Sequence, residues 1–188
     1  MPLNRLIVAS PEKDANAYYA TRFLAPDAII YLEVSGKRIL VASELEIERA
    51  RKQARVDKVI SYSEVIDELR KNKTKPTSAA VIKTVASKFG ASAFAFPHNF
   101  PLGLARELEK QKIHLKPEKN FFPQRVIKTS EETRAIETAT HATVKAIENA
   151  VKTIESSTDR GGKIYYEGTA LTSEVVKKQW QSLNNLKS

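Results

Sequence analysis

The 188-residue sequence contains no cysteine, only six glycines and a single tryptophan. Without cysteine the chain can form no disulfide, no Cys-ligated zinc site, no iron–sulfur cluster and no thiol nucleophile, and a reducing compartment is compatible with it. The few glycines and eight prolines form no biased tract, which argues against a fibrous or low-complexity chain. Because 41% of the residues are hydrophobic and 28% are charged, the composition predicts a globular protein of one large domain or one and a half ordinary ones.

Long apolar segments and nucleotide-binding motifs are also missing. The apolar stretch at residues 6–9 is too short for the core of a signal peptide, and no later run approaches the roughly 18 apolar residues of a membrane helix. We therefore expect a cytoplasmic protein without a membrane partner. The sequence contains no glycine-rich phosphate loop, no Walker motif and no Ser–His–Asp order, and the isolated Gly161 and Gly162 predict the end of a helix.

The net charge of +9 raises the question of an acidic partner such as nucleic acid. Almost all of the excess, +8, lies in residues 1–125. Its two densest clusters have acidic neighbours close by, which favours solvated helix faces over a nucleic-acid surface. The clusters are Arg49, Arg51, Lys52, Arg55 and Lys58, and Arg70, Lys71, Lys73 and Lys75, beside Glu44, Glu46, Glu48, Glu64, Asp67 and Glu68.

Residues 1–125 alternate between short runs rich in aliphatic and aromatic residues and patterns of helical period, which is typical of an α/β domain. Gly36 lies between two of the runs and favours a tight antiparallel hairpin, so the sheet is predicted to be mixed, with helices on both faces. The predicted strands are residues 3–9, 28–34, 38–42, 58–61, 92–96 and 113–116. The predicted helices are residues 14–19, 44–54, 63–71, 78–89 and 102–111.

The strand-like runs stop after Pro123, and we place a domain boundary between residues 125 and 126. Thr129 and Glu132 have the spacing of a capping box, and apolar residues then recur every three or four positions through a long amphipathic helix. A second helix carries Trp180 on its apolar side. The two helices would form a helical hairpin whose apolar faces nothing in the remaining sequence covers, which predicts that the chain is the beginning of a longer protein.

Three stretches carry a further signal in their order and spacing. The first stretch consists of NAYYATRFLAPD at 16–27, the hairpin sequence IIYLEVSGKRILVASELEIERA at 29–50 and VDKVISYSEVIDEL at 56–69. The second is KTSEETRAIETATHAT at 128–143, and the third is EG at 167–168 with LTSE at 171–174. Together they resemble the N-terminal part of the creatinase, prolidase and Xaa-Pro aminopeptidase family of pita-bread metallopeptidases. The resemblance implies a ribonuclease H-like, creatinase N-terminal-like α/β domain at 1–125, and the linker and first helices of a truncated pita-bread catalytic domain at 126–188.

The resemblance implies a parent enzyme with two divalent metal ions, which two Asp, one His and two Glu hold and which activate a bridging water. In the family these ligands follow the junction helix. In this sequence the acidic residues after that helix are Asp159, Glu167 and Glu174, and no histidine follows His141. We therefore predict no catalytic, cofactor-binding or metal-ligating residue in this chain, which would be a fragment of a metal-dependent Xaa-Pro dipeptidase or aminopeptidase.

Family resemblance also implies homodimers and, in several members, a loop after the opening helix that reaches a neighbouring active site. In this sequence that loop is residues 21–27. Where relatives commonly have glycine before the aromatic residue, this chain has Arg22 before Phe23. The difference argues against carrying a substrate-contacting role over to Arg22, for which an exposed loop cation is the simpler interpretation.

The remaining candidate residues have plain structural interpretations. His98, His114 and His141 are too far apart in sequence for a metal set; His98 follows a predicted strand, where open α/β sheets often bind ligands, but an exposed loop histidine is simpler. The aromatic pairs are not interleaved with the basic clusters, which favours packing over stacking on single-stranded nucleic acid. These pairs are Tyr18 and Tyr19, Phe121 and Phe122, and Tyr165 and Tyr166.

The sequence therefore favours a non-catalytic N-terminal domain of a proline-specific metallo-exopeptidase, which serves dimerisation and access to the active site. Its expected partners are a second copy and the catalytic domain of its own parent chain. Two alternatives stay open. One is a basic binding module for nucleic acid or another acidic partner, and the other is a natural, inactive pseudoenzyme of this length.

Overall fold

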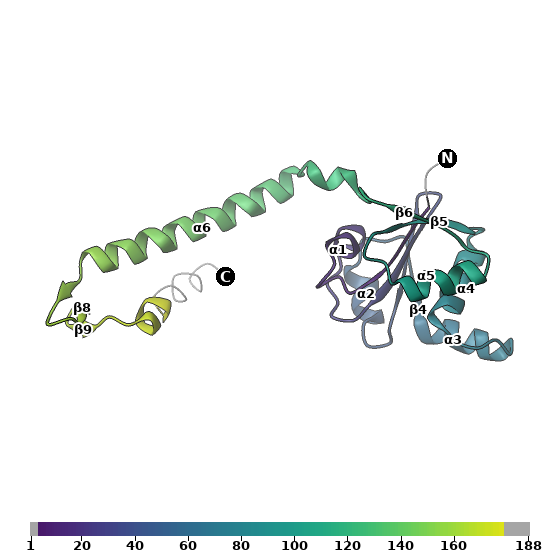
Figure 1. Ribbon diagram of the computed structural model, residues 1–188, viewed down its shortest axis with the longest axis horizontal. Helices are drawn as coiled ribbons and strands as arrows, with labels where there is room; N and C mark the ends of the chain where they lie inside the picture. Colours follow the sequence, from purple (N-terminus) through teal and green to yellow (C-terminus); the bar gives the residue numbers. More distant parts are fainter. Residues whose placement is uncertain (1–3, 179–188) are drawn as a thin grey trace. The chain divides into compact units, whose positions relative to one another are not determined.

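The computed structural model describes residues 4–178 of the chain. Two compact units are present, the first ending at Arg125 and the second beginning at Val126. The first contains the large sheet with α1 to α5, and the second contains the long helix α6 and a small sheet (Figure 1). A short 3-10 helix, η1 (Pro123–Val126), lies at the boundary.

The first unit is built on a six-stranded mixed sheet with the strand order β4-β3-β2-β1-β5-β6. β2 pairs antiparallel with both β1 and β3, whereas β3 with β4, β1 with β5, and β5 with β6 are parallel. All six strands predicted from the sequence are present, and the mixed sheet is confirmed. The strands are β1 (Arg5–Ala9), β2 (Ile29–Val34), β3 (Lys37–Ala42), β4 (Lys58–Ser61), β5 (Ala93–Pro97) and β6 (His114–Glu118).

A tight turn joins β2 and β3, as the sequence predicted. Ser35 and Gly36 both have positive φ angles, 52° and 83°, which is the pattern of a type I′ turn and matches the twist of paired strands. Asn4 supports the turn from the neighbouring strand, because its Oδ1 accepts a hydrogen bond from the Ser35 backbone N–H at 3.1 Å. The turn thus fixes the register in which β2 and β3 pair.

One face of the sheet is covered by α1 (Ala15–Thr21) and α2 (Ile47–Gln53). Side chains alternate along a strand, so every second residue of β1, β2 and β3 points to this face. The core here is formed by residues of α1 and α2 with large strand residues, and Tyr31 is the largest fully buried side chain among residues 4–178. Its buried members include Ile7, Ala17, Ala20, Phe23, Ile29, Tyr31, Leu40, Ile47 and Ala50.

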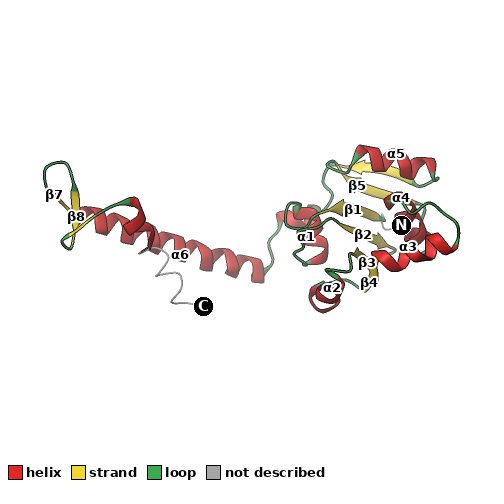
Figure 2. Ribbon diagram, turned by 90° about the horizontal axis from the view of Figure 1, so that it is seen from below, coloured by secondary structure: helices red, strands yellow, loops and turns green. Residues whose placement is uncertain are grey.

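The opposite face is covered by α3 (Tyr62–Lys71), α4 (Ser78–Lys88) and α5 (Leu102–Lys110). Figure 2 shows α1 and α2 on one side of the sheet and α3 and α4 on the other. α4 contributes most to this second core, with six buried residues along its 11 positions. The predicted arrangement of helices on both faces is therefore confirmed. The helices also begin and end within about three residues of their predicted limits.

The second unit begins with α6 (Ser130–Glu155), the long helix predicted from residue 130. The predicted capping box is present, because the Thr129 hydroxyl accepts from the Glu132 backbone N–H at 3.2 Å and the Glu132 carboxylate accepts from the Thr129 backbone N–H at 3.0 Å. Among the residues described, no helix has both the length and the apolar composition to cross a bilayer.

A small antiparallel sheet follows α6, which the sequence pattern did not predict. Its strands are β7 (Thr158–Asp159), β8 (Ile164–Tyr166) and β9 (Thr169–Ala170), in that order across the sheet. Gly161 and Gly162 lie in the turn between β7 and β8 with positive φ, and they do not end the helix directly. Residues 173–178 are helical, so a second helix is present after the sheet, whereas Trp180 lies outside the described residues.

Candidate functional site

A row of charged side chains crosses three adjacent strands on the face that α1 and α2 cover. The register pairs Arg5 of β1 with Glu33 of β2, and Glu33 with Arg38 of β3. Tyr31, two residues before Glu33, shares this face and is buried. The apolar core of this face therefore gives way to charged groups at the end of the sheet near the β2–β3 turn.

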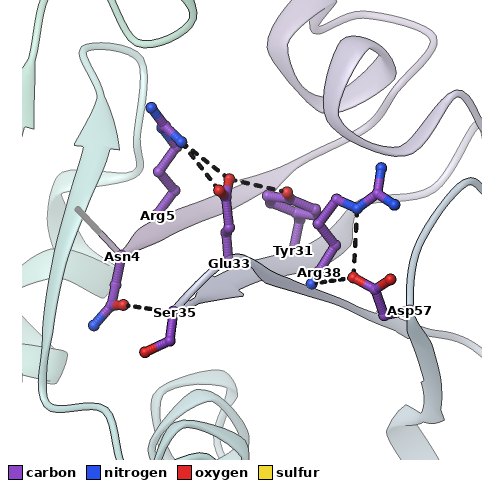
Figure 3. Close-up of polar contacts among 7 residues, drawn as sticks. All are labelled: Asn4, Arg5, Tyr31, Glu33, Ser35, Arg38 and Asp57. Atoms are coloured by element: carbon purple, nitrogen blue, oxygen red, sulfur yellow. Dashed lines mark hydrogen bonds and ion pairs between the residues drawn. The ribbon is translucent and has the colours of Figure 1, made fainter. Parts of the chain in front are cut away.

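Glu33 is the centre of the row (Figure 3). Nη1 of Arg5 donates to both Glu33 carboxylate oxygens, at 3.2 and 3.1 Å, and the Tyr31 hydroxyl donates to Oε2 at 3.3 Å. Burial and then the Glu33 carboxylate raise the pKa of the Tyr31 hydroxyl above its ordinary value, against smaller lowering effects of Arg38 and Arg5. The phenol is therefore protonated at neutral pH and remains a hydrogen-bond donor to Glu33.

Asp57, in the segment between α2 and β4, holds Arg38 at the other end of the row. Its Oδ2 accepts from the Arg38 backbone N–H at 2.7 Å and from Arg38 Nε at 3.4 Å. The backbone hydrogen bond is the largest cause that lowers the pKa of the Asp57 carboxyl, and the Arg38 side chain adds to it. Asp57 is consequently ionised at neutral pH and keeps Arg38 beside Tyr31 (Figure 3).

The C-cap of α1 adds a third arginine. Arg22 has the left-handed conformation, with φ 50° and ψ 25°, and its backbone N–H donates to the Tyr18 carbonyl at 2.7 Å. Glycine adopts this conformation most readily, and other L-residues do so at a cost of roughly 1–2 kcal/mol. The Arg22 guanidinium lies 5.0 Å from the centroid of the Tyr19 ring. Arg22 is half-buried, so the predicted exposed loop cation is wrong in that respect.

Aromatic side chains close one side of the site. The Phe122 ring centroid lies 5.2 Å from that of Tyr19 and 4.9 Å from that of Phe121, which is itself buried. The guanidinium of Arg5 lies 5.2 Å from the Phe122 centroid. The predicted packing role is therefore confirmed for Phe121, Phe122 and Tyr19, whereas Tyr18 is exposed.

These groups surround an open cavity of about 380 Å³, which we call the arginine pocket. Its lining contains four arginines but a single carboxylate, that of Glu33. The fourth arginine, Arg55, follows α2 and is tied to the end of α1, because its backbone N–H donates to the Thr21 carbonyl at 2.7 Å. The lining residues are Arg5, Tyr19, Ala20, Arg22, Tyr31, Glu33, Arg38, Arg55, Phe122 and Gln124.

The histidines lie elsewhere. His98, His114 and His141 are all exposed, as predicted for His98 and His114, and the lining of the pocket includes none of the three. Within residues 4–178 no group of three or more histidine, aspartate or glutamate side chains is arranged to hold a metal ion.

Three arginines of the dense basic clusters pair with nearby acids. Arg49 donates to Glu46 and Arg51 to Glu48, each at 2.6 Å, and Arg70 donates to Asp67 at 3.2 Å, all three bonds between residues three apart on a helix. Arg51 and Arg70 thus lie on solvated helix faces, as predicted, whereas Arg55 of the first cluster lines the arginine pocket. The sequence analysis missed the arginine pocket because its four arginines come from four separate segments, which only the strand register and the end of α1 bring together.

No protein-family model matches the chain, and no curated protein sequence matches it either. Several solved structures, in contrast, superpose on the chain. An X-Pro aminopeptidase from Thermotoga maritima superposes with a TM-score of 0.69 at 14% identity, covering 98% of this chain and 46% of the aminopeptidase. A prolidase from Pyrococcus horikoshii OT3 superposes with a TM-score of 0.63 at 19% identity, covering 99% and 45%.

An Xaa-Pro dipeptidase from Bacillus anthracis gives a TM-score of 0.62 at 14% identity and similar coverage, 98% of this chain and 45% of the dipeptidase. This chain therefore spans less than half the length of the structures that it resembles. At such low identity the superpositions describe the backbone and not the chemistry of individual side chains. They bear out the fold that the sequence resemblance implied: the chain has the fold of the N-terminal domain of prolidase and Xaa-Pro aminopeptidase structures.

Proposed function

We propose that this chain is the non-catalytic N-terminal part of a proline-specific metallo-exopeptidase, which contributes to dimerisation and to access to the active site. The observation that carries the proposal is the extent of the structural similarity. The superposition on the Thermotoga maritima X-Pro aminopeptidase covers 98% of this chain, so both units take part, whereas it covers only 46% of the aminopeptidase. The chemistry of the parent enzyme would then belong to a catalytic domain outside the matched part.

The association role is supported by α6. Five of its large aliphatic side chains are exposed and lie on one side of the helix, because the last four follow one another at intervals of three, four and three residues. We call this the α6 stripe: Ile136, Val144, Ile147, Val151 and Ile154. A contiguous apolar surface of this kind is typical of a protein–protein interface. In the parent enzyme we expect the catalytic domain to cover this stripe, and for the isolated chain we infer that a second copy covers it.

An assay of peptide hydrolysis tests the non-catalytic role. Purified chain is incubated with an Xaa-Pro dipeptide and with a longer Xaa-Pro peptide, in the presence of Mn²⁺, Co²⁺ or Zn²⁺. We expect no hydrolysis above the background of metal and buffer, because the described residues offer no cluster of metal ligands. Metal-dependent hydrolysis that persists through a second purification, at constant activity per milligram, would contradict the proposal.

A further inference from the structure

We propose that the arginine pocket is a binding site for a small organic anion, one that carries a carboxylate or phosphate group on an apolar or aromatic body. This inference goes beyond the proposed function and does not depend on it, since every lining residue belongs to the first unit. At about 380 Å³ the pocket has the size of small-molecule sites. It is far too small for a folded partner.

The charge balance of the pocket favours an anion. Four guanidinium groups line it together with the Glu33 carboxylate, and Asp57 beside Arg38 is the second acidic group at the site, so the four positive and two negative charges leave +2. Arginines gathered at this density repel one another, and an anionic ligand removes that repulsion. Guanidinium also has the geometry that matches two oxygens of a carboxylate or phosphate at once.

Arg5, Arg38 and Arg55 also have unused hydrogen-bond donors. Among the described residues, both side-chain hydrogen bonds of Arg5 leave from Nη1, and the side-chain bond of Arg38 leaves from Nε. For Arg55 the described part of the chain supplies a partner to the backbone N–H alone. A guanidinium carries five N–H donors, so these three side chains can bind ligand oxygens without breaking their present contacts.

The remaining lining suits the body of such a ligand. Tyr19 and Phe122 present neighbouring rings, with centroids 5.2 Å apart, on the side of the pocket next to Arg5 and Arg22. A planar or aliphatic group can stack there while its charged end contacts the arginines. Arg22 holds its position at the cost of a left-handed backbone, a form of local strain that occurs preferentially at binding sites.

Titration calorimetry on the full chain tests the proposal with inorganic phosphate, phenyl phosphate and benzoate, each at the same ionic strength set with chloride. We expect saturable binding of phenyl phosphate or benzoate, and tighter binding of phenyl phosphate than of inorganic phosphate because of the aromatic wall. The comparison of phenyl phosphate with benzoate identifies which oxyanion the pocket prefers. If none of the three binds saturably, the proposal is wrong.

Two substitutions locate the binding. Arg55→Gln changes an exposed side chain, and Arg22→Gly introduces the residue favoured in a left-handed cap. Each substitution removes one cation and is expected to weaken binding about tenfold or more. Arg106→Gln in α5, on the other side of the sheet, is the matched control with the same loss of charge. Equal weakening by Arg106→Gln would show that only the overall charge attracts the anion, and would overturn the assignment. Loss of binding confined to Arg55→Gln and Arg22→Gly, with unchanged circular dichroism, supports it.

Discussion

Tyr31 lies between the apolar core and the arginine pocket, because its ring is fully buried while its hydroxyl donates to Glu33 at 3.3 Å. Burial first, and Glu33 second, raise the pKa of this hydroxyl in the folded chain. The folded state thus holds the Tyr31 proton more tightly than the unfolded state, in which tyrosine ionises near pH 10. The folded state is consequently more stable while the Tyr31 phenol is protonated than after it ionises.

This linkage predicts a loss of stability in alkali. Since the folded chain binds more protons than the unfolded chain above about pH 10, the free energy of unfolding falls there as pH rises, by at most about 1.4 kcal/mol per pH unit from this group. Urea unfolding of the wild type and of Tyr31→Phe at pH 9 and pH 11 measures it. The variant, which lacks the titrating group, should lose less stability between the two pH values. Equal losses in the two proteins would show that Tyr31 does not cause the effect.

Arg22 illustrates the limit of sequence reasoning at single residues. The family resemblance implied glycine at the position of Arg22, and the left-handed φ of 50° found there is one that glycine adopts most readily. The direction of its side chain could not be predicted, because it depends on where the Tyr19 ring lies at the end of α1. An exposed loop residue was therefore predicted, and a half-buried lining residue is found.

Among the elements, β5 gives the clearest test of packing. It lies between β1 and β6 in the interior of the sheet, and its residues alternate between the two faces. Phe94 is 3% exposed within the core beneath α4 and α5, whereas Phe96 is half-buried against Phe100, with ring centroids 5.2 Å apart. The two phenylalanines thus differ in how much apolar surface they bury.

We expect Phe94→Ala to lower the free energy of unfolding by about 3–5 kcal/mol, the usual range for a buried phenylalanine. Phe96→Ala should lower it by less than about 2 kcal/mol, because part of that side chain already contacts water. Urea unfolding followed by circular dichroism compares the two. A loss below about 1 kcal/mol for Phe94→Ala would show that β5 is not packed as the structure describes.

The large elements could be predicted and the smallest could not. β2 and β3 are short apolar runs with a glycine turn between them, and α6 has a capping box and a helical period, so local sequence determines each one. β7 and β9 have two residues each, too few for any period to show. The arginine pocket was missed for another reason: strand register and the end of α1 assemble it from distant segments.

At the scale of the whole molecule, we propose an accessory part that associates with a second copy through the α6 stripe. The stripe side chains are about half exposed, between 45% and 57%. α6 has 26 residues and is about 39 Å long at 1.5 Å per residue, and the stripe from Ile136 to Ile154 runs along about 27 Å of it. A strip of that length offers a second copy a continuous surface to bury.

The most direct test is the mass of the purified chain in solution, measured by sedimentation equilibrium from low to high micromolar concentration. We predict a dimer of about 42 kDa, twice the chain mass of 21.0 kDa, for the wild type. Ile147→Glu places a charge in the stripe and should yield monomer, whereas Asn149→Glu, which adds the same charge to an exposed position on another side of α6, should remain dimeric. A mass of 21.0 kDa at every concentration, or an Ile147→Glu variant as dimeric as the wild type, would contradict the proposed association.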